Sequence, residues 1–182
     1  MPGDHEPTKI EISLEPLRPE HANEMLEGLS APEGYRFLPD HPPASANDLR
    51  EKYVRQARGG SADGAEIWCN WIIRDRQTTE AMGYTQATIR DHSALIAYHL
   101  FTRFWRSGIG TNAVYATLSI LFEMMDVNRA FALVDTRNAG SMALLRKLGF
   151  SSIRRHVGAD FFKGTTNDEF EFELRLAAWN DR

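Results

Sequence analysis

The residues best suited to bind a charged ligand lie in a short glycine turn. Gly108 and Gly110 follow a strand-like segment and precede a helix-like one. Glycine lets the backbone approach a ligand closely. The free amides at a helix start, together with the helix dipole, favour a phosphate or pyrophosphate. Arg106 adds a positive charge beside this turn, which runs through Ser107, Gly108, Ile109, Gly110 and Thr111.

This turn differs from the commonest nucleotide-binding loops. No Gly-Lys-Ser/Thr follows it, as a P-loop requires, and a dinucleotide fingerprint would need glycine in place of Ala113. Taken alone, Gly-x-Gly is equally compatible with a tight turn that binds nothing. A second motif is therefore needed to assign a ligand.

The second motif runs from Asn138 to Phe150. Asn138 or Ala139 can cap a short helix through Leu148, and Gly149 occupies the position after its end. The two motifs, separated by one short strand, resemble the GCN5-related N-acetyltransferase (GNAT) superfamily. The RimJ/RimL-like branch, which includes enzymes acting on ribosomal-protein N-termini, is most similar. Leu17-Arg18-Pro19 and the segment Glu173 to Trp179 also resemble that branch, so the resemblance covers nearly the whole chain.

The resemblance implies an acetyl-CoA site between a fourth and a fifth strand that diverge. It assigns Tyr98, His99 and Leu100 to the acetyl-pantetheine arm. The amides of residues 106–111 would bind the pyrophosphate. Asn138 and Ser141 would complete the cofactor contacts.

The resemblance leaves the catalytic groups open. Its usual acid, a tyrosine, is replaced by Leu145, and the glutamate base of the ribosomal-alanine branch is replaced by Leu133. Ser141 is our candidate for the thiolate partner, with helix capping as the alternative. His99 is the best-placed base, although a structural role is the more common one for such a histidine.

Other reactive residues have weaker claims. Asp135 could act through a water but equally suits a turn, and Glu66 and Asp91 suit strand ends. Aromatic side chains could wall an acceptor pocket or belong to the core: Phe37, Trp68 and Trp71. Cys69 has no base nearby in sequence, so we do not expect a nucleophile. The histidines lack metal-ligand spacing, and we expect no metal.

The element pattern predicts one α/β (α+β) domain over residues 10–182, after a tail of residues 1–9. We expect a GNAT-like, mixed but mostly antiparallel sheet of about seven strands, flanked by about four helices and splayed between strands four and five. The expected strands are 10–15, 66–74, 81–90, 93–101, 129–134, 151–156 and 169–176. The expected helices are 20–29, 45–58, 111–125 and 138–148, and a loop covers residues 30–43.

Composition narrows the class of protein. The 182 residues carry 21 Lys+Arg and 25 Asp+Glu, a net charge of −4, which argues against a nucleic-acid backbone binder. We find neither a membrane-length apolar run nor a signal sequence, and we expect no membrane partner. One cysteine suggests a reducing compartment, so we expect a cytoplasmic protein.

The resulting hypothesis is transfer of acetyl from acetyl-CoA to a primary amine by direct attack in a ternary complex. The amine could be a protein N-terminus, which needs an open groove, or a small molecule, which needs a closed acidic pocket. We expect the loop 30–43 and the segment 156–167 to determine which kind of amine is accepted. A degenerate member that senses or scaffolds acyl-CoA is the alternative, and an unrelated phosphate binder is a third. A homodimer through the closing strands is compatible with the sequence.

Overall fold

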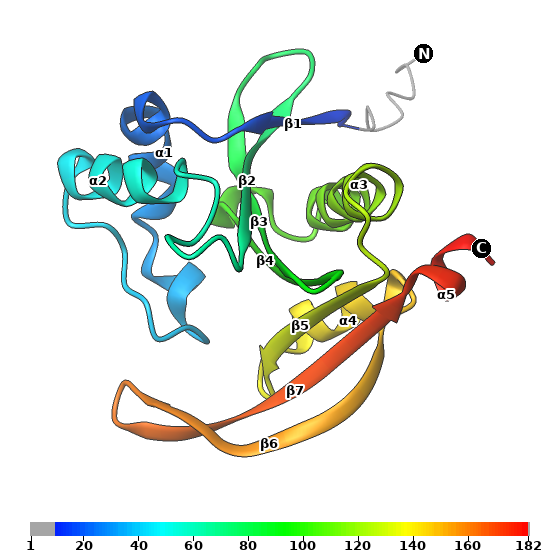
Figure 1. The fold of residues 1–182 in the computed structure, drawn as a ribbon. Coiled ribbons are helices and arrows are strands. Elements are labelled where there is room, and N and C mark those ends of the chain that lie inside the picture. Colours follow the sequence, from blue (N-terminus) through cyan, green and yellow to red (C-terminus); the bar gives the residue numbers. More distant parts are fainter. Residues whose placement is uncertain (1–9, 182) are drawn as a thin grey trace, which may run out of the picture.

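The computed structural model describes residues 10–181, so the expected tail of residues 1–9 lies outside the described part. Seven strands form one sheet in the order β1-β2-β3-β4-β5-β7-β6 (Figure 1). The strands are β1 (Ile12–Pro16), β2 (Ile67–Asp75), β3 (Ala81–Arg90), β4 (Ser93–Leu100), β5 (Arg129–Asp135), β6 (Ser151–Phe162) and β7 (Thr165–Arg175). The α-helices are α1 (Ala22–Leu29), α2 (Ala46–Gln56), α3 (Ile109–Met124), α4 (Ala139–Lys147) and α5 (Leu176–Asn180).

The sheet opens between its two central strands. Every neighbouring pair is antiparallel except β4 and β5, which are parallel and register over only three pairs, ending at Leu95 and Phe131. Beyond Leu95 the end of β4 is not in register with β5. The predicted mixed sheet and its splay are therefore confirmed.

Alternation along the strands divides the core into two layers. Ala94 and Ile96 of β4 pack in one apolar cluster with Val114 and Leu118 of α3. On the opposite face, Ile72 of β2 belongs to a cluster with residues of α1 and α2. Helices α1 and α2 thus cover one face of the sheet, and α3 and α4 cover the other, as Figure 1 shows. Successive side chains on β4 therefore reach different layers.

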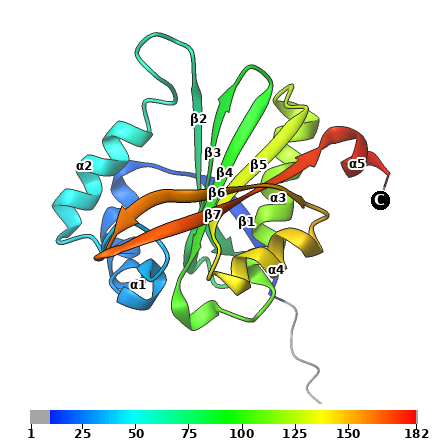
Figure 2. The ribbon, with the colours of Figure 1, turned by 90° about the horizontal axis from the view of Figure 1, so that it is seen from below.

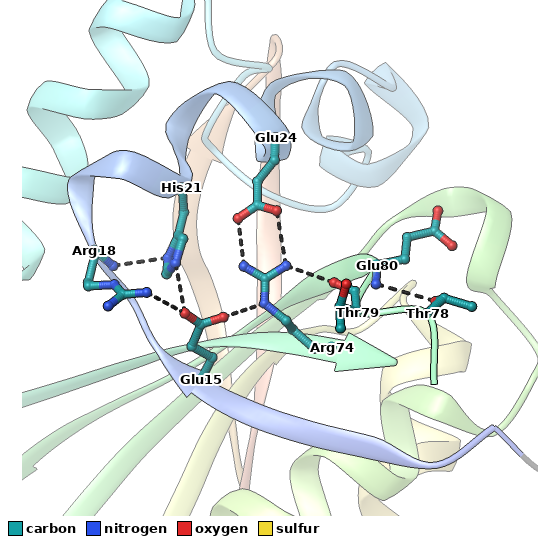
Figure 3. Close-up of polar contacts among 8 residues, drawn as sticks. All are labelled: Glu15, Arg18, His21, Glu24, Arg74, Thr78, Thr79 and Glu80. Carbon is teal, nitrogen blue, oxygen red and sulfur yellow. Dashed lines mark hydrogen bonds and ion pairs between the residues drawn. The ribbon is translucent and has the colours of Figure 1, made fainter. Parts of the chain in front are cut away.

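An ion-pair network from β2 fixes α1 to the sheet (Figure 3). The Arg74 guanidinium donates to Glu24 of α1 at 2.6 and 3.0 Å and also to Glu15 of β1. These hydrogen bonds lower the pKa of both carboxyl groups. His21 joins the network through Glu15 at 3.1 Å. The network thereby sets where the loop after α1 begins.

The chain ends differently from the prediction. The two closing strands are longer than expected, because residues 157–162 and 165–168 are also strand, and β6 and β7 form one long hairpin. Lys163 and Gly164 form its turn with φ of +51° and +76°, as a type I′ turn requires. In Figure 2, a view from below, the hairpin crosses in front of the other strands toward α1 and α2. The prediction of about four helices missed α5.

Candidate active site

The predicted anion turn lies directly after β4. Gly108 has φ of +83° and precedes α3, while Arg106 has φ of +62°. The first helical bond runs from Asn112 N to Gly108 O at 3.1 Å, so the amides just before it have no acceptor within the helix. A Cβ added at Gly108 would meet nothing within 4 Å. The space beside Gly108 is therefore open.

Local bonds hold this turn against the sheet. The Trp105 indole donates to Leu100 O at 2.9 Å, and Ser107 Oγ donates to Phe104 O at 2.5 Å. The Ile109 amide donates to Ser107 Oγ at 3.4 Å. The turn is fixed to the end of β4, where the strands separate. It combines a helix start, open space and a nearby arginine, which suits a pyrophosphate.

A pair of hydroxyl groups lies on the α4 side of the opening. Tyr98 Oη and Ser141 Oγ are 2.6 Å apart. Asn138 caps α4, because its side chain accepts from the Ser141 amide at 3.1 Å. Burial raises the pKa of Tyr98 to about 12, so the phenol keeps its proton at neutral pH. The pair can donate a hydrogen bond to a developing anion. Sequence reasoning gave Tyr98 only a contact with the pantetheine arm.

His99 points to the other face of the sheet. It is 6% exposed, and its ring lies 5.5 Å from that of Tyr84 and 5.0 Å from that of Tyr35. Burial, followed by the charge of Lys52, lowers the pKa of His99 to about 4. A neutral imidazole with this pKa is a weak proton acceptor for an ammonium group. These surroundings favour the structural alternative, and the catalytic role remains a prediction.

The two positions to which the resemblance assigns an acid and a base carry apolar side chains without a proton to exchange. Leu145 of α4 is fully buried in the hydrophobic core, and Leu133 of β5 is 44% exposed. Asp135 is held by the Arg137 guanidinium at 2.6 and 2.9 Å, which lowers the pKa of this carboxyl. A carboxylate bound in this way is a poor base, and its position at the end of β5 fits the turn role.

The remaining candidates lie on β2 or beside the end of a strand. Trp71 is a core residue, and Trp68 donates to Glu66 at 2.8 Å. Asp91 is exposed at the start of the turn between β3 and β4. Burial raises the pKa of the Cys69 thiol, which disfavours a nucleophilic thiolate. None of these five residues lies in the turn after β4.

Glu169 of β7 is a carboxylate that sequence reasoning missed. It is opposite Asp135 of β5 and His156 of β6, and residues in opposite positions share a face. His99 shares one face of β4 with Ala97 and Leu95, and Leu95 is aligned with Phe131, so this face is also that of His99. Burial and the charge of Asp160 raise the pKa of Glu169, which brings it nearer to a useful base. The alternation of Glu169 with Phe170 was the available signal.

The two segments expected to decide the acceptor contact each other. Lys163, at the hairpin turn, donates to the carbonyls of Tyr35, Leu38 (2.9 Å) and Asp40 (3.4 Å). The Arg137 guanidinium lies 5.9 Å from the Phe37 ring. The loop after α1 is therefore tied to the hairpin rather than separated from it by an open groove.

Two findings concern metal ions and membranes. Within residues 10–181 no cluster of three or more histidine, cysteine or acidic side chains could hold a metal ion. In the same residues no helix has the length and apolar character that a membrane crossing demands.

Comparison with known proteins adds the family. The profile of the acetyltransferase (GNAT) domain matches residues 11–151. An uncharacterised N-acetyltransferase of Bacillus subtilis (strain 168), YoaA, is 30% identical over 83 residues, or 44% of this chain. The match spans about half (47%) of the length of that relative.

Two solved structures share the fold at low identity. Spermidine N-acetyltransferase from Vibrio cholerae, solved with CoA and spermine, has a TM-score of 0.79 at 15% identity, covering 93% of this chain and 98% of that one. RimL, a ribosomal L7/L12 α-N-protein acetyltransferase solved with CoA, has a TM-score of 0.80 at 18% identity, covering 92% and 95%. With a profile match over most of its length and this fold, the chain belongs to the GNAT family of N-acetyltransferases.

Proposed function

We propose that the protein transfers an acetyl group from acetyl-CoA to a primary amine by direct attack in a ternary complex. The observation that carries this proposal is the open helix start at Gly108, located where β4 leaves β5. The amides of residues 106–111 would hold the pyrophosphate, and the free edge of residues 98–100 would bond the amide-rich pantetheine arm. The solved relatives bound to CoA support the same ligand.

The chain offers groups for both proton movements. Bound acetyl-CoA would supply a thioester whose C–S bond breaks as the amine nitrogen attacks the carbonyl carbon, so that the amine loses a proton and the sulfur gains one. Tyr98 and Ser141, paired at 2.6 Å, would hydrogen-bond the departing sulfur and protonate it. Glu169, with its raised pKa, is the candidate to accept the proton of the amine, directly or through water.

Calorimetry with acetyl-CoA tests the binding step. We expect micromolar affinity in the wild type and its loss in Gly108→Asp, where a carboxylate faces the pyrophosphate. Gly108→Asn is the matched control, because it has the same size and tolerates the positive φ similarly. Binding that is equal in both variants contradicts the anion site, and a folded wild type that binds no acetyl-CoA contradicts the function.

Leu145 and Leu133 favour a second function, that of an acyl-CoA sensor or scaffold without turnover. CoA release with a panel of amines and peptides separates the two. Tight binding without CoA release supports the sensor, whereas release with any amine supports the enzyme.

A further inference from the structure

The edge of β4 that faces β5 is free beyond the last aligned pair, Leu95 and Phe131. The direction of its polar groups follows from the opposite edge, where the Phe101 amide donates to Met82 O of β3 at 2.9 Å. Hydrogen-bonded and non-hydrogen-bonded pairs alternate along an antiparallel ladder, so the polar groups of the preceding residue, Leu100, point away from β3. The Leu100 carbonyl is therefore directed into the opening between β4 and β5.

One side chain already bonds that carbonyl. The Trp105 indole N–H donates to Leu100 O at 2.9 Å. Trp105 follows the 3-10 turn Thr102–Phe104, and its own amide donates to Thr102 O at 3.1 Å, which holds the residue close to the end of β4. Although the indole is fixed at the free edge in this way, Trp105 is 46% exposed. Because its N–H is bonded, the exposed part of the side chain is mostly apolar ring surface.

Trp105 lies between the two ends of the proposed cofactor site. On one side it adjoins the turn of residues 106–111, which would hold the pyrophosphate. On the other side, Leu100 is two residues from Tyr98, whose hydroxyl pairs with Ser141 at 2.6 Å and would face the departing sulfur. The pantetheine arm of CoA joins the pyrophosphate to the sulfur. An arm that spans these two points must therefore pass the indole bonded to Leu100 O.

We propose that the Trp105 ring is a wall of the cofactor site and packs against the pantetheine arm. The proposal rests on the acetyl-CoA binding proposed above. The indole N–H satisfies Leu100 O, so the amides of the arm bond the remaining groups of the free edge near Tyr98. The methylene and methyl groups of the arm cover the exposed ring, which removes apolar surface of both partners from water.

Two ligands separate contact with the arm from contact with the nucleotide: acetyl-CoA and 3′-phospho-ADP, the nucleotide half of CoA without the arm. We expect Trp105→Ala to weaken acetyl-CoA binding, measured by calorimetry, at least about tenfold, because the apolar contact is lost. The affinity for 3′-phospho-ADP should stay within about twofold. Trp105→Phe keeps a ring at this position and should recover part of the lost affinity.

Tyr115→Ala is the matched control. Tyr115 is similarly exposed (50%), but it packs against Trp179 of α5 and not at the free edge of β4. This variant should bind both ligands like the wild type. Equal acetyl-CoA affinity in Trp105→Ala and the wild type overturns the proposal. An equal loss for both ligands would mean that Trp105 only shapes the turn, and no recovery in Trp105→Phe would mean that the ring surface does not matter, so either result also overturns it.

Tryptophan fluorescence reports the contact directly. Trp105 is the most exposed of the four tryptophans, since Trp71 and Trp179 are 9% and 8% exposed and Trp68 is partly buried. Acrylamide should therefore quench mainly Trp105 in the free protein. Acetyl-CoA should protect this component, 3′-phospho-ADP should not, and Trp105→Phe should lack it. Stronger quenching with acetyl-CoA would mean that the arm displaces the indole from Leu100, which contradicts the proposal.

The behaviour of the wild type separates a failure of this inference from a failure of the proposed function. If the wild type binds acetyl-CoA and Trp105 is not protected, the cofactor assignment stands and the wall is overturned. If a folded wild type binds no acetyl-CoA, the proposed function and the wall are both overturned.

Discussion

At the scale of single residues, the chemistry depends on which face of β4 each side chain reaches. Tyr98 points toward α4 and bonds Ser141, whereas its neighbour His99 points toward Tyr35 and Tyr84. Strand alternation therefore separates the group suited to stabilise a thiolate from the histidine that the sequence suggested as base. The two residues call for different measurements.

Removing the Tyr98 hydroxyl should slow acetyl transfer. We expect Tyr98→Phe to lower kcat roughly 10- to 100-fold, because the departing sulfur loses a hydrogen-bond and proton donor. The affinity for acetyl-CoA, measured by calorimetry, should stay within about threefold. Ser141→Ala should lower kcat similarly, and the double variant should lose little more, since both act as one pair. Additive losses would contradict a joint role.

His99 should make the folded state sensitive to acid. The unfolded imidazole takes a proton near its ordinary pKa of 6.5, whereas folded His99 stays neutral down to about pH 4. Between these values the unfolded state binds more protons, so stability that is complete above pH 6.5 is lost as pH falls toward 4. Urea unfolding should show a loss of about 2 kcal/mol between pH 7 and 5. His99→Phe should lack this component, and an equal loss in the variant would contradict it.

At the scale of elements, the placement of α1 depends on one arginine. Arg74 joins Glu24 of α1 to Glu15 of β1, and its side chain is only 16% exposed. We expect Arg74→Met to lower the free energy of unfolding by about 2–3 kcal/mol, since it leaves Glu24 without a cation and leaves Glu15 only its contacts with Arg18 and His21. Arg103→Met is the control, because the Arg103–Glu80 pair is about half exposed and should matter by less than about 1 kcal/mol. Similar losses in both variants would contradict the role of the network.

The elements that the sequence predicts well are those with a local signal. The cap at Asn138 and the glycine turn at Gly108 each combine a residue type with a spacing, and both occur as expected. The hairpin beyond His156 gave no such signal. Residues such as Val157 and Phe161 are exposed, so no buried face imposes an alternating pattern.

The parts of the candidate site that escaped prediction depend on distant contacts. The Tyr35 carbonyl and Lys163 are 128 residues apart, and residues of α2 and of β3 line one pocket. Neither contact can be predicted from the composition of a short segment. Likewise, the neutral state of His99 follows from burial against Tyr35 and Tyr84, which only the assembled fold creates.

At the scale of the whole molecule, the hairpin joins the two halves that the splay separates. The paired register of β4 and β5 covers three residue pairs, yet Lys163 at the end of β6 reaches the loop after α1. Through Tyr35 and Asp40 that loop also lines a pocket beside α2 and β3. Lys163 therefore ties the loop after α1 to the β6–β7 hairpin.

Replacing Lys163 should loosen this connection. Its ammonium donates to three carbonyls of the loop, and Lys163→Met keeps the length of the side chain but removes every donor. Hydrogen bonds from a charged group contribute about 1.5–3 kcal/mol, so the loop should open at least about tenfold more often. Trypsin cleavage after the exposed Arg36, followed by mass spectrometry, reports this opening.

The cleavage rate of Lys163→Met needs a control variant that also loses one trypsin site. Lys147→Met meets this condition, because Lys147 is exposed in the last turn of α4, away from the loop. We expect cleavage after Arg36 to accelerate about tenfold in Lys163→Met and to keep its wild-type rate in Lys147→Met. If both variants are cleaved like the wild type, the three carbonyl bonds do not hold the loop, and its position must come from the packing of Phe37 under Arg137.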